Sequence, residues 1–184
     1  MASDYIADHI TQIDSGKCRF ANCWAAVGAY LVDSGTRGKK RPTPMEFRKA
    51  AGAMRGCRTG GLGDIIVGCQ RYGVRVTLKT DVNRATLSRW FASRKSERVY
   101  AGAADWEVWP DDKKCAGDYD GYHATAIVPG LNQQKNVRTM DPLCSKLRWV
   151  RKGDIIDALF EYNDEHPGQK RNTADVLYVR VPKA

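Results

Sequence analysis

The chain has 184 residues, of which 42% are hydrophobic and 28% charged, and its formal net charge is +9. These values fit one globular domain covering residues 1–184. No stretch approaches the ~20 apolar residues that span a bilayer, and the first residues lack the basic region and apolar core of a secretory signal. We therefore expect no membrane span, and synthesis in the cytoplasm.

The first half of the chain is predicted to be mainly helical. An apolar run begins at Cys23, directly after Asn22, which can serve as N-cap, and ends at Val32 before a polar loop. Residues 43–46 (Thr-Pro-Met-Glu) form a capping-box pattern with proline at the first helical position. Helices are expected at 23–32, 43–54, 62–72 and 86–93.

Strands dominate the second half. Residues 74–78 and 176–181 alternate apolar and polar side chains, which is typical of half-exposed strands. Further strands are expected at 98–102, 122–128, 136–140 and 146–150, with a helix at 154–162. Helices in one half and strands in the other favour an α+β fold, and no repeat or low-complexity linker divides the chain.

Cys23 stands where a polar loop becomes a buried helix. In the first turn of a helix, unpaired backbone N–H groups and the positive end of the macrodipole favour a thiolate over a thiol. His123 lies near the start of the apolar strand 122–128, and Asp141 directly follows the strand 136–140. A nucleophile on a helix, a base on a strand and a carboxylate on the next strand are the parts of a Cys-His-Asp site.

Each of these residues also has an ordinary structural interpretation. A free cysteine on a helix is usually a small buried hydrophobe, and an aspartate before proline commonly opens a turn. Their joint occurrence favours the catalytic interpretation, because the chain has 3 histidines and the other two lack comparable surroundings. His9 lies in the N-terminal segment and His166 in a polar loop.

These motifs, in this order and with these elements between them, resemble the papain-like cysteine peptidases. Within that group they are similar to the double-glycine, bacteriocin-processing peptidases, over roughly residues 10–162. The resemblance implies N-terminal helices packed on an antiparallel sheet. It also implies that Cys23 is the nucleophile, that His123 is the general base and acid, and that Asp141 orients the imidazole. No metal or organic cofactor is expected.

The resemblance also concerns the oxyanion hole. Relatives carry a glutamine upstream of the cysteine, and its side-chain amide helps to stabilise the oxyanion. The usual position, six residues before Cys23, is Lys17 in this chain. Gln12, eleven residues before Cys23, is the expected substitute if the loop through Cys18 folds back.

The resulting hypothesis is a bacterial or phage cysteine peptidase or related amide hydrolase. Its substrate would be a peptide, either the stem peptides of peptidoglycan or a protein precursor. One alternative is a weakly active or inactive papain-like structural component of a phage virion or tail, which would be virion-associated. A second alternative is a basic nucleic-acid-binding module.

That second alternative depends on an uneven distribution of charge. Residues 37–98 carry sixteen lysines and arginines against four acids, and residues 105–120 carry six acids against two lysines. A basic surface attracts nucleic acid, anionic polymers or an acidic protein face, although it can equally be a solvated surface.

The acidic segment 103–121 contains Trp106 and Trp109, and it is long for a loop of a compact domain. In one interpretation, both rings fold back and cap the sheet. In the other, the segment borders the active-site cleft and contacts substrate or an assembly partner.

The six cysteines are widely spaced and form no Cys-x-x-Cys pair. In a chain synthesised in a reducing compartment, this pattern indicates mostly free thiols rather than a disulfide framework.

Overall fold

The computed structural model describes residues 6–8, 10, 22–53, 60–93, 97–105, 122–129, 135–144, 146–166 and 170–183. The helices are α1 (Cys23–Thr36), α2 (Pro44–Ala50), α3 (Leu62–Arg71), α4 (Arg84–Phe91) and α5 (Lys152–Glu165). The strands are β1 (Val76–Val82), β2 (Arg98–Asp105), β3 (Tyr122–Val128), β4 (Asn136–Met140), β5 (Arg148–Arg151) and β6 (Ala174–Arg180).

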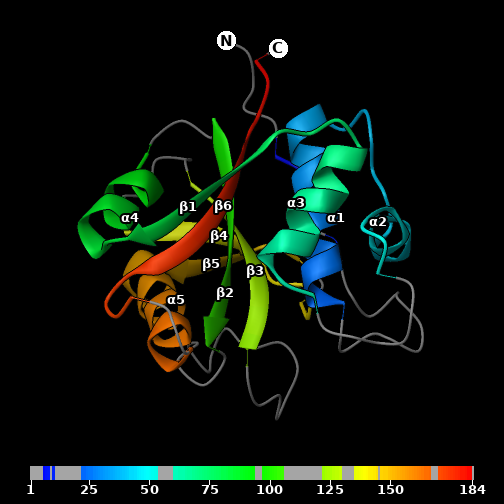
Figure 1. The fold of residues 1–184 in the computed structure, drawn as a ribbon. Helices are drawn as coiled ribbons and strands as arrows, with labels where there is room; N and C mark the ends of the chain where they lie inside the picture. The colour runs from blue at the N-terminus through cyan, green and yellow to red at the C-terminus, as the bar shows by residue number, and fades with distance from the viewer. Residues whose placement is uncertain are drawn as a thin grey trace.

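In these ranges the strands form a 6-stranded sheet in the order β1-β6-β2-β3-β4-β5. Each neighbouring pair is antiparallel. Helices α1, α2 and α3 lie on one side of the sheet, and α4 and α5 lie on the other (Figure 1). The predicted α+β organisation, with N-terminal helices on an antiparallel sheet, is confirmed.

The central strands supply side chains to both layers. On the paired strands β2 and β6, Val99 and Leu177 belong to the core under α1. Their sequence neighbours Tyr100 and Tyr178 belong to the core under α4 and α5. This alternation follows from the period of two in a β-strand, and it explains why both faces of these strands are apolar.

Helix α1 is the central element of the first layer. Its residues from Cys23 to Ser34 are all buried, and the helix contacts β2, β3, β6, α2 and α3. A helix that is apolar on all sides is stable only inside a core. The site of Cys23 is therefore fixed by a rigid, fully packed element.

Some boundaries differ from those predicted. Helix α1 continues past Val32 to Thr36 and ends at Arg37, which has a left-handed backbone with φ of 51°. Helix α2 ends at Ala50, because Gly52 turns the chain with φ of 77°. Strand β1 extends beyond the predicted 74–78 to Val82. No helix in the described ranges is long and apolar enough to cross a membrane.

Candidate active site

Asn22 occupies the N-cap position before Cys23, but its side chain makes no capping hydrogen bond to α1. Its amide oxygen instead accepts a hydrogen bond from Nη1 of Arg48 at 2.5 Å, and its Nδ2 lies 3.6 Å from Sδ of Met45. Asn22 therefore holds the predicted N-cap position, but its side chain does not cap the helix. The physical reason is that the buried guanidinium of Arg48 requires an acceptor there.

Arg48 contacts both sequence neighbours of Cys23. Its side chain is buried, its Nε donates to the carbonyl of Ala53 at 2.7 Å, and its guanidinium lies 5.9 Å from the ring centroid of Trp24. Sequence reasoning missed this residue, because an arginine on a short amphipathic helix is ordinarily exposed. The pattern around Arg48 gives no signal that it is buried.

His123 and Asp141 are joined by a short buried contact. Nε2 of His123 lies 2.8 Å from Oδ1 of Asp141, and the two side chains are 2% and 1% exposed. The pairing of β3 with β4, in which Ala126 lies opposite Met140, brings the two residues together. Oδ1 of Asp141 also accepts the N–H of Leu143 at 2.9 Å, so the aspartate both opens a turn and holds the imidazole.

The side chains of Cys23 and His123 line the same cleft and lie close enough for each to shift the pKa of the other. Because Asp141 holds Nε2, Nδ1 is the ring nitrogen available to the sulfur. Burial raises the pKa of Cys23, but the hydrogen bond and charge of His123 and the N–H groups of Ala124 and Trp24 outweigh burial. The pKa of Cys23 is therefore lowered from its ordinary value.

The pKa of His123 changes in the opposite direction. Burial lowers it, but the hydrogen bonds and charges of Asp141 and Cys23 more than compensate, so the net shift is upward. The two shifts together favour a thiolate–imidazolium pair, which is the reactive form of a cysteine nucleophile. The structure thus brings together three of the four residues predicted for the site.

A cleft of about 340 Å³ opens at Cys23 and His123. One wall comes from α1 and α3, and the other from the start of β3 and the end of α5. The lining residues are Cys23, Trp24, Gly60, Gly61, Leu62, Ile65, Ala103, Tyr122, His123, Ala124, Tyr162 and His166. His166 was predicted to lie in a polar loop that begins at residue 163, but the helix continues through that region. Helix α5 extends to Glu165 and carries His166 to the cleft.

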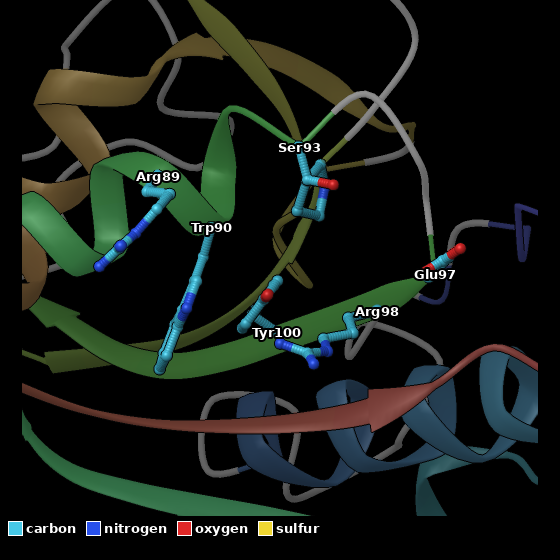
Figure 2. A pocket seen from close by; sticks show the side chains of 7 residues that line it. Arg89, Trp90, Ser93, Glu97, Arg98 and Tyr100 are labelled. Carbon is cyan, nitrogen blue, oxygen red and sulfur yellow. The ribbon is translucent and has the colours of Figure 1, made fainter.

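A second hollow, of about 280 Å³, lies between α4 and β2 (Figure 2). Trp90 stacks on Tyr100 there with ring centroids 5.7 Å apart, and Arg98 is hydrogen-bonded to Tyr100. None of Cys23, His123 and Asp141 lines this hollow. The candidate chemistry therefore belongs to the first cleft.

Some predictions fall outside the described residues. Gln12, Lys17, Trp106 and Trp109 belong to this group, so the proposed oxyanion donor and most of the acidic segment stay predictions. The segment was expected to begin at residue 103, but residues 103–105 complete β2. Ala103 lines the cleft.

The described cysteines are of two kinds. Cys23 and Cys69 are free, as expected, whereas Cys144 is disulfide-bonded, so the expectation of free thiols is wrong for that residue. Burial raises the pKa of Cys69 to about 12. In the described part of the chain, no group of three or more His, Cys, Asp or Glu is arranged to hold a metal ion.

The described helices, sheet and cleft have the arrangement of a papain-like cysteine peptidase. Several solved structures share this fold over nearly the whole chain. One is the peptidase domain of Streptococcus ComA, a bifunctional ABC transporter involved in quorum sensing, with a TM-score of 0.56 and 14% identity. The alignment covers 95% of this chain and 98% of the ComA peptidase domain.

Another solved structure with this fold is a Bacillus anthracis protein described as a C39-like peptidase. It has a TM-score of 0.61 and 12% identity, and the alignment covers 100% of this chain and 98% of that one. No protein-family model and no curated protein matches the sequence. At these identities the comparisons show the fold, and they confirm the papain-like resemblance at that level.

Proposed function

We propose that the chain is a cysteine peptidase or a closely related amide hydrolase. The observation that carries the proposal is the buried His123–Asp141 pair, which lies at the same cleft as Cys23. The opposite pKa shifts of the cysteine and the histidine support it, because general acid–base and nucleophilic roles require such perturbed groups.

In the first half of the reaction, the Cys23 thiolate attacks the carbonyl carbon of the substrate amide. A C–S bond forms, and the carbonyl electron pair moves to oxygen. When this intermediate collapses, the C–N bond breaks and the leaving nitrogen takes the proton from the His123 imidazolium. The products of this half are a free amine and a thioester on Cys23.

In the second half, water hydrolyses the thioester. His123 takes a proton from the water while the water oxygen attacks the thioester carbon. The C–S bond then breaks and releases a carboxylic acid. Asp141 keeps the imidazole oriented and stabilises its charged form. The net reaction consumes one amide and one water and returns the thiolate–imidazolium pair.

Two donors are proposed to stabilise the oxyanion: the backbone N–H of Cys23 and the side-chain amide of Gln12. Fixed donors of this kind act where negative charge develops in the transition state. Removing one typically costs ~2.7–4 kcal/mol of transition-state stabilisation. The position of Cys23 at the start of α1 supports the first donor, because backbone N–H groups of the first turn have no partner within a helix.

We propose a peptide as substrate, either stem peptides of peptidoglycan or a protein precursor. The shared fold of the ComA peptidase domain supports a peptide substrate in general terms. Cytoplasmic synthesis and a bacterial or phage origin belong to this proposal, whereas association with a virion belongs to the alternative, a weakly active or inactive structural component.

The test is cleavage of a complex peptide library, read by mass spectrometry as new N-termini. The unaltered protein is expected to produce new termini that Cys23→Ala and His123→Ala do not produce. Cys69→Ala is the matched control, because Cys69 is also a free, buried cysteine on a helix of the same layer. New termini that persist in Cys23→Ala would overturn the assignment of the nucleophile.

A further inference from the structure

Three aromatic rings form one wall of the cleft, next to His123. The ring of Tyr122 meets that of Tyr162 edge-on at 4.9 Å and that of His166 at 4.4 Å. Tyr162 and His166 are stacked at 4.0 Å. We name this group, Tyr122, Tyr162 and His166, the aromatic wall.

The polar end of Tyr122 is fixed by the protein. Its hydroxyl donates a hydrogen bond to Oε2 of Glu165 at 2.7 Å, and this bond raises the pKa of Tyr122 to about 12. Because the hydroxyl already has its partner, the ring stays neutral and cannot turn away without losing that bond. The part of Tyr122 that is offered to the cleft is therefore the ring itself.

Tyr122 is also unusually exposed for a packed aromatic residue. In the described part of the chain, the exposed large hydrophobic side chains are Val67, Leu78 and Tyr122, at 43%, 41% and 40%. Of these three, Tyr122 alone lines the cleft, and it directly precedes His123. A rigid aromatic ring held in place loses little entropy when a ligand covers it.

We propose that the aromatic wall binds a large uncharged side chain, preferably aromatic, of the substrate residue beside the scissile amide. This inference rests on the proposed function and names the specificity of that site. Two rings at van der Waals contact gain energy from apolar burial and from favourable ring geometry. The wall would thereby position the amide for attack by Cys23.

The charges near the wall exclude an acidic side chain at this position. The carboxylate of Glu165 accepts the hydrogen bond of the Tyr122 hydroxyl, and the carboxylate of Asp105 also acts on that hydroxyl. A substrate carboxylate in this subsite would meet like charges in a partly enclosed space. The expected order of preference is therefore aromatic, then small, then acidic.

The experiment uses small thiol-alkylating amides, because they report on the cleft without a known substrate. N-benzyl, N-methyl, N-carboxymethyl and N-(2-aminoethyl) chloroacetamide differ only in the group offered to the wall. The rate of Cys23 modification is measured by peptide mass spectrometry and divided by the rate of each reagent with free cysteine. Cys69 in the same molecule reports non-specific alkylation.

The variants are Tyr122→Ala, Tyr122→Phe and the control Leu78→Ala. Leu78 is matched to Tyr122 in exposure but lies on β1, away from the cleft. We expect the normalised benzyl rate to exceed the methyl rate by about two- to tenfold, the range that one aromatic contact supplies. Tyr122→Ala should remove this preference, whereas Tyr122→Phe and Leu78→Ala should retain it.

The outcomes separate the two proposals. If Cys23 reacts much faster than Cys69 but the benzyl and methyl reagents react equally, the proposed specificity of the aromatic wall is overturned. The assignment of Cys23 as nucleophile is then retained. A fastest rate with the cationic aminoethyl reagent would also overturn it, because charge rather than the ring would then decide. If no reagent modifies Cys23 faster than Cys69, the proposed function fails, and the specificity with it. The reagent comparison on the unaltered protein decides these cases even if Tyr122→Ala does not fold.

Discussion

One buried arginine contacts the residues on both sides of Cys23, the proposed nucleophile. Arg48 donates a hydrogen bond to Asn22 and lies over the ring of Trp24, so it contacts the residues before and after Cys23. A buried guanidinium is stable only when its donors have acceptors, and here Asn22 and Ala53 supply two of them. Arg48 is therefore a positioning residue for the start of α1.

Replacing Arg48 should weaken the fold and slow the modification of Cys23. In Arg48→Met, the acceptors on Asn22 and Ala53 lose their donor, and an unsatisfied buried group of this kind costs about 1–3 kcal/mol. The free energy of unfolding in urea measures the loss. The matched control is Arg84→Met, because Arg84 forms an exposed ion pair with Asp157 that is worth about 0–1 kcal/mol. Equal losses of the free energy of unfolding in the two variants would contradict the positioning role of Arg48.

Asp141 helps to raise the pKa of His123, through its hydrogen bond to the imidazole and through its charge. In Asp141→Asn the amide can still accept a hydrogen bond, but the negative charge is lost, so the pKa of His123 should fall. NMR titration of the imidazole measures this fall. The same change should reduce any amide hydrolysis by about 10²–10⁴-fold. Asp157→Asn is the control, and an unchanged His123 titration in Asp141→Asn would contradict the role of Asp141.

At the scale of elements, α1 and α3 approach each other around one ring. Phe47, on α2, lies against two glycines. A Cβ at Gly28 on α1 would come within 2.2 Å of this ring, and one at Gly68 on α3 within 2.3 Å. The glycines are therefore required by close packing, since neither has a strained backbone angle.

Gly28→Ala is expected to destabilise the fold by about 1–3 kcal/mol, the usual effect of overpacking a core. Gly63→Ala, on α3, is the matched control, because a Cβ there meets no atom within 4 Å. It should stabilise the helix by up to ~1 kcal/mol, since alanine has the higher helix propensity. The free energy of unfolding in urea measures both effects. A change in the same direction in the two variants would contradict the role of close packing at Gly28.

The sequence predicted elements best where the pattern is local. Strands β3 and β4 have the predicted limits, because each is a short apolar run with turn signals on both sides. The positions of Cys23, His123 and Asp141 followed from the same patterns. Arg48 and His166 could not be assigned in this way, because contacts between distant segments determine their burial and their partners. For His166, the available signal was its position four residues after Tyr162, which is the spacing of one helix face.

At the scale of the whole molecule, the sheet separates two cores, and the first core carries the site. Helices α1, α2 and α3 pack against one face, while α4 and α5 cover the other (Figure 1). The cleft lies where the start of α1 meets the starts of α3 and β3 and the end of α5. Cys23, His123 and Asp141 are thus each supported by packed elements, which is the condition for fixed catalytic geometry.

The central claim is that His123 holds Cys23 as a thiolate, and the pH dependence of Cys23 alkylation by iodoacetamide tests it most directly. Because the pKa of Cys23 is lowered from its ordinary value of 9.0, the rate should stay high as the pH falls well below that value. Cys69, with its pKa raised to about 12, should stay unmodified in the same sample. His123→Ala should move the Cys23 profile to higher pH. A Cys23 rate no greater than that of Cys69 at neutral pH would contradict the account.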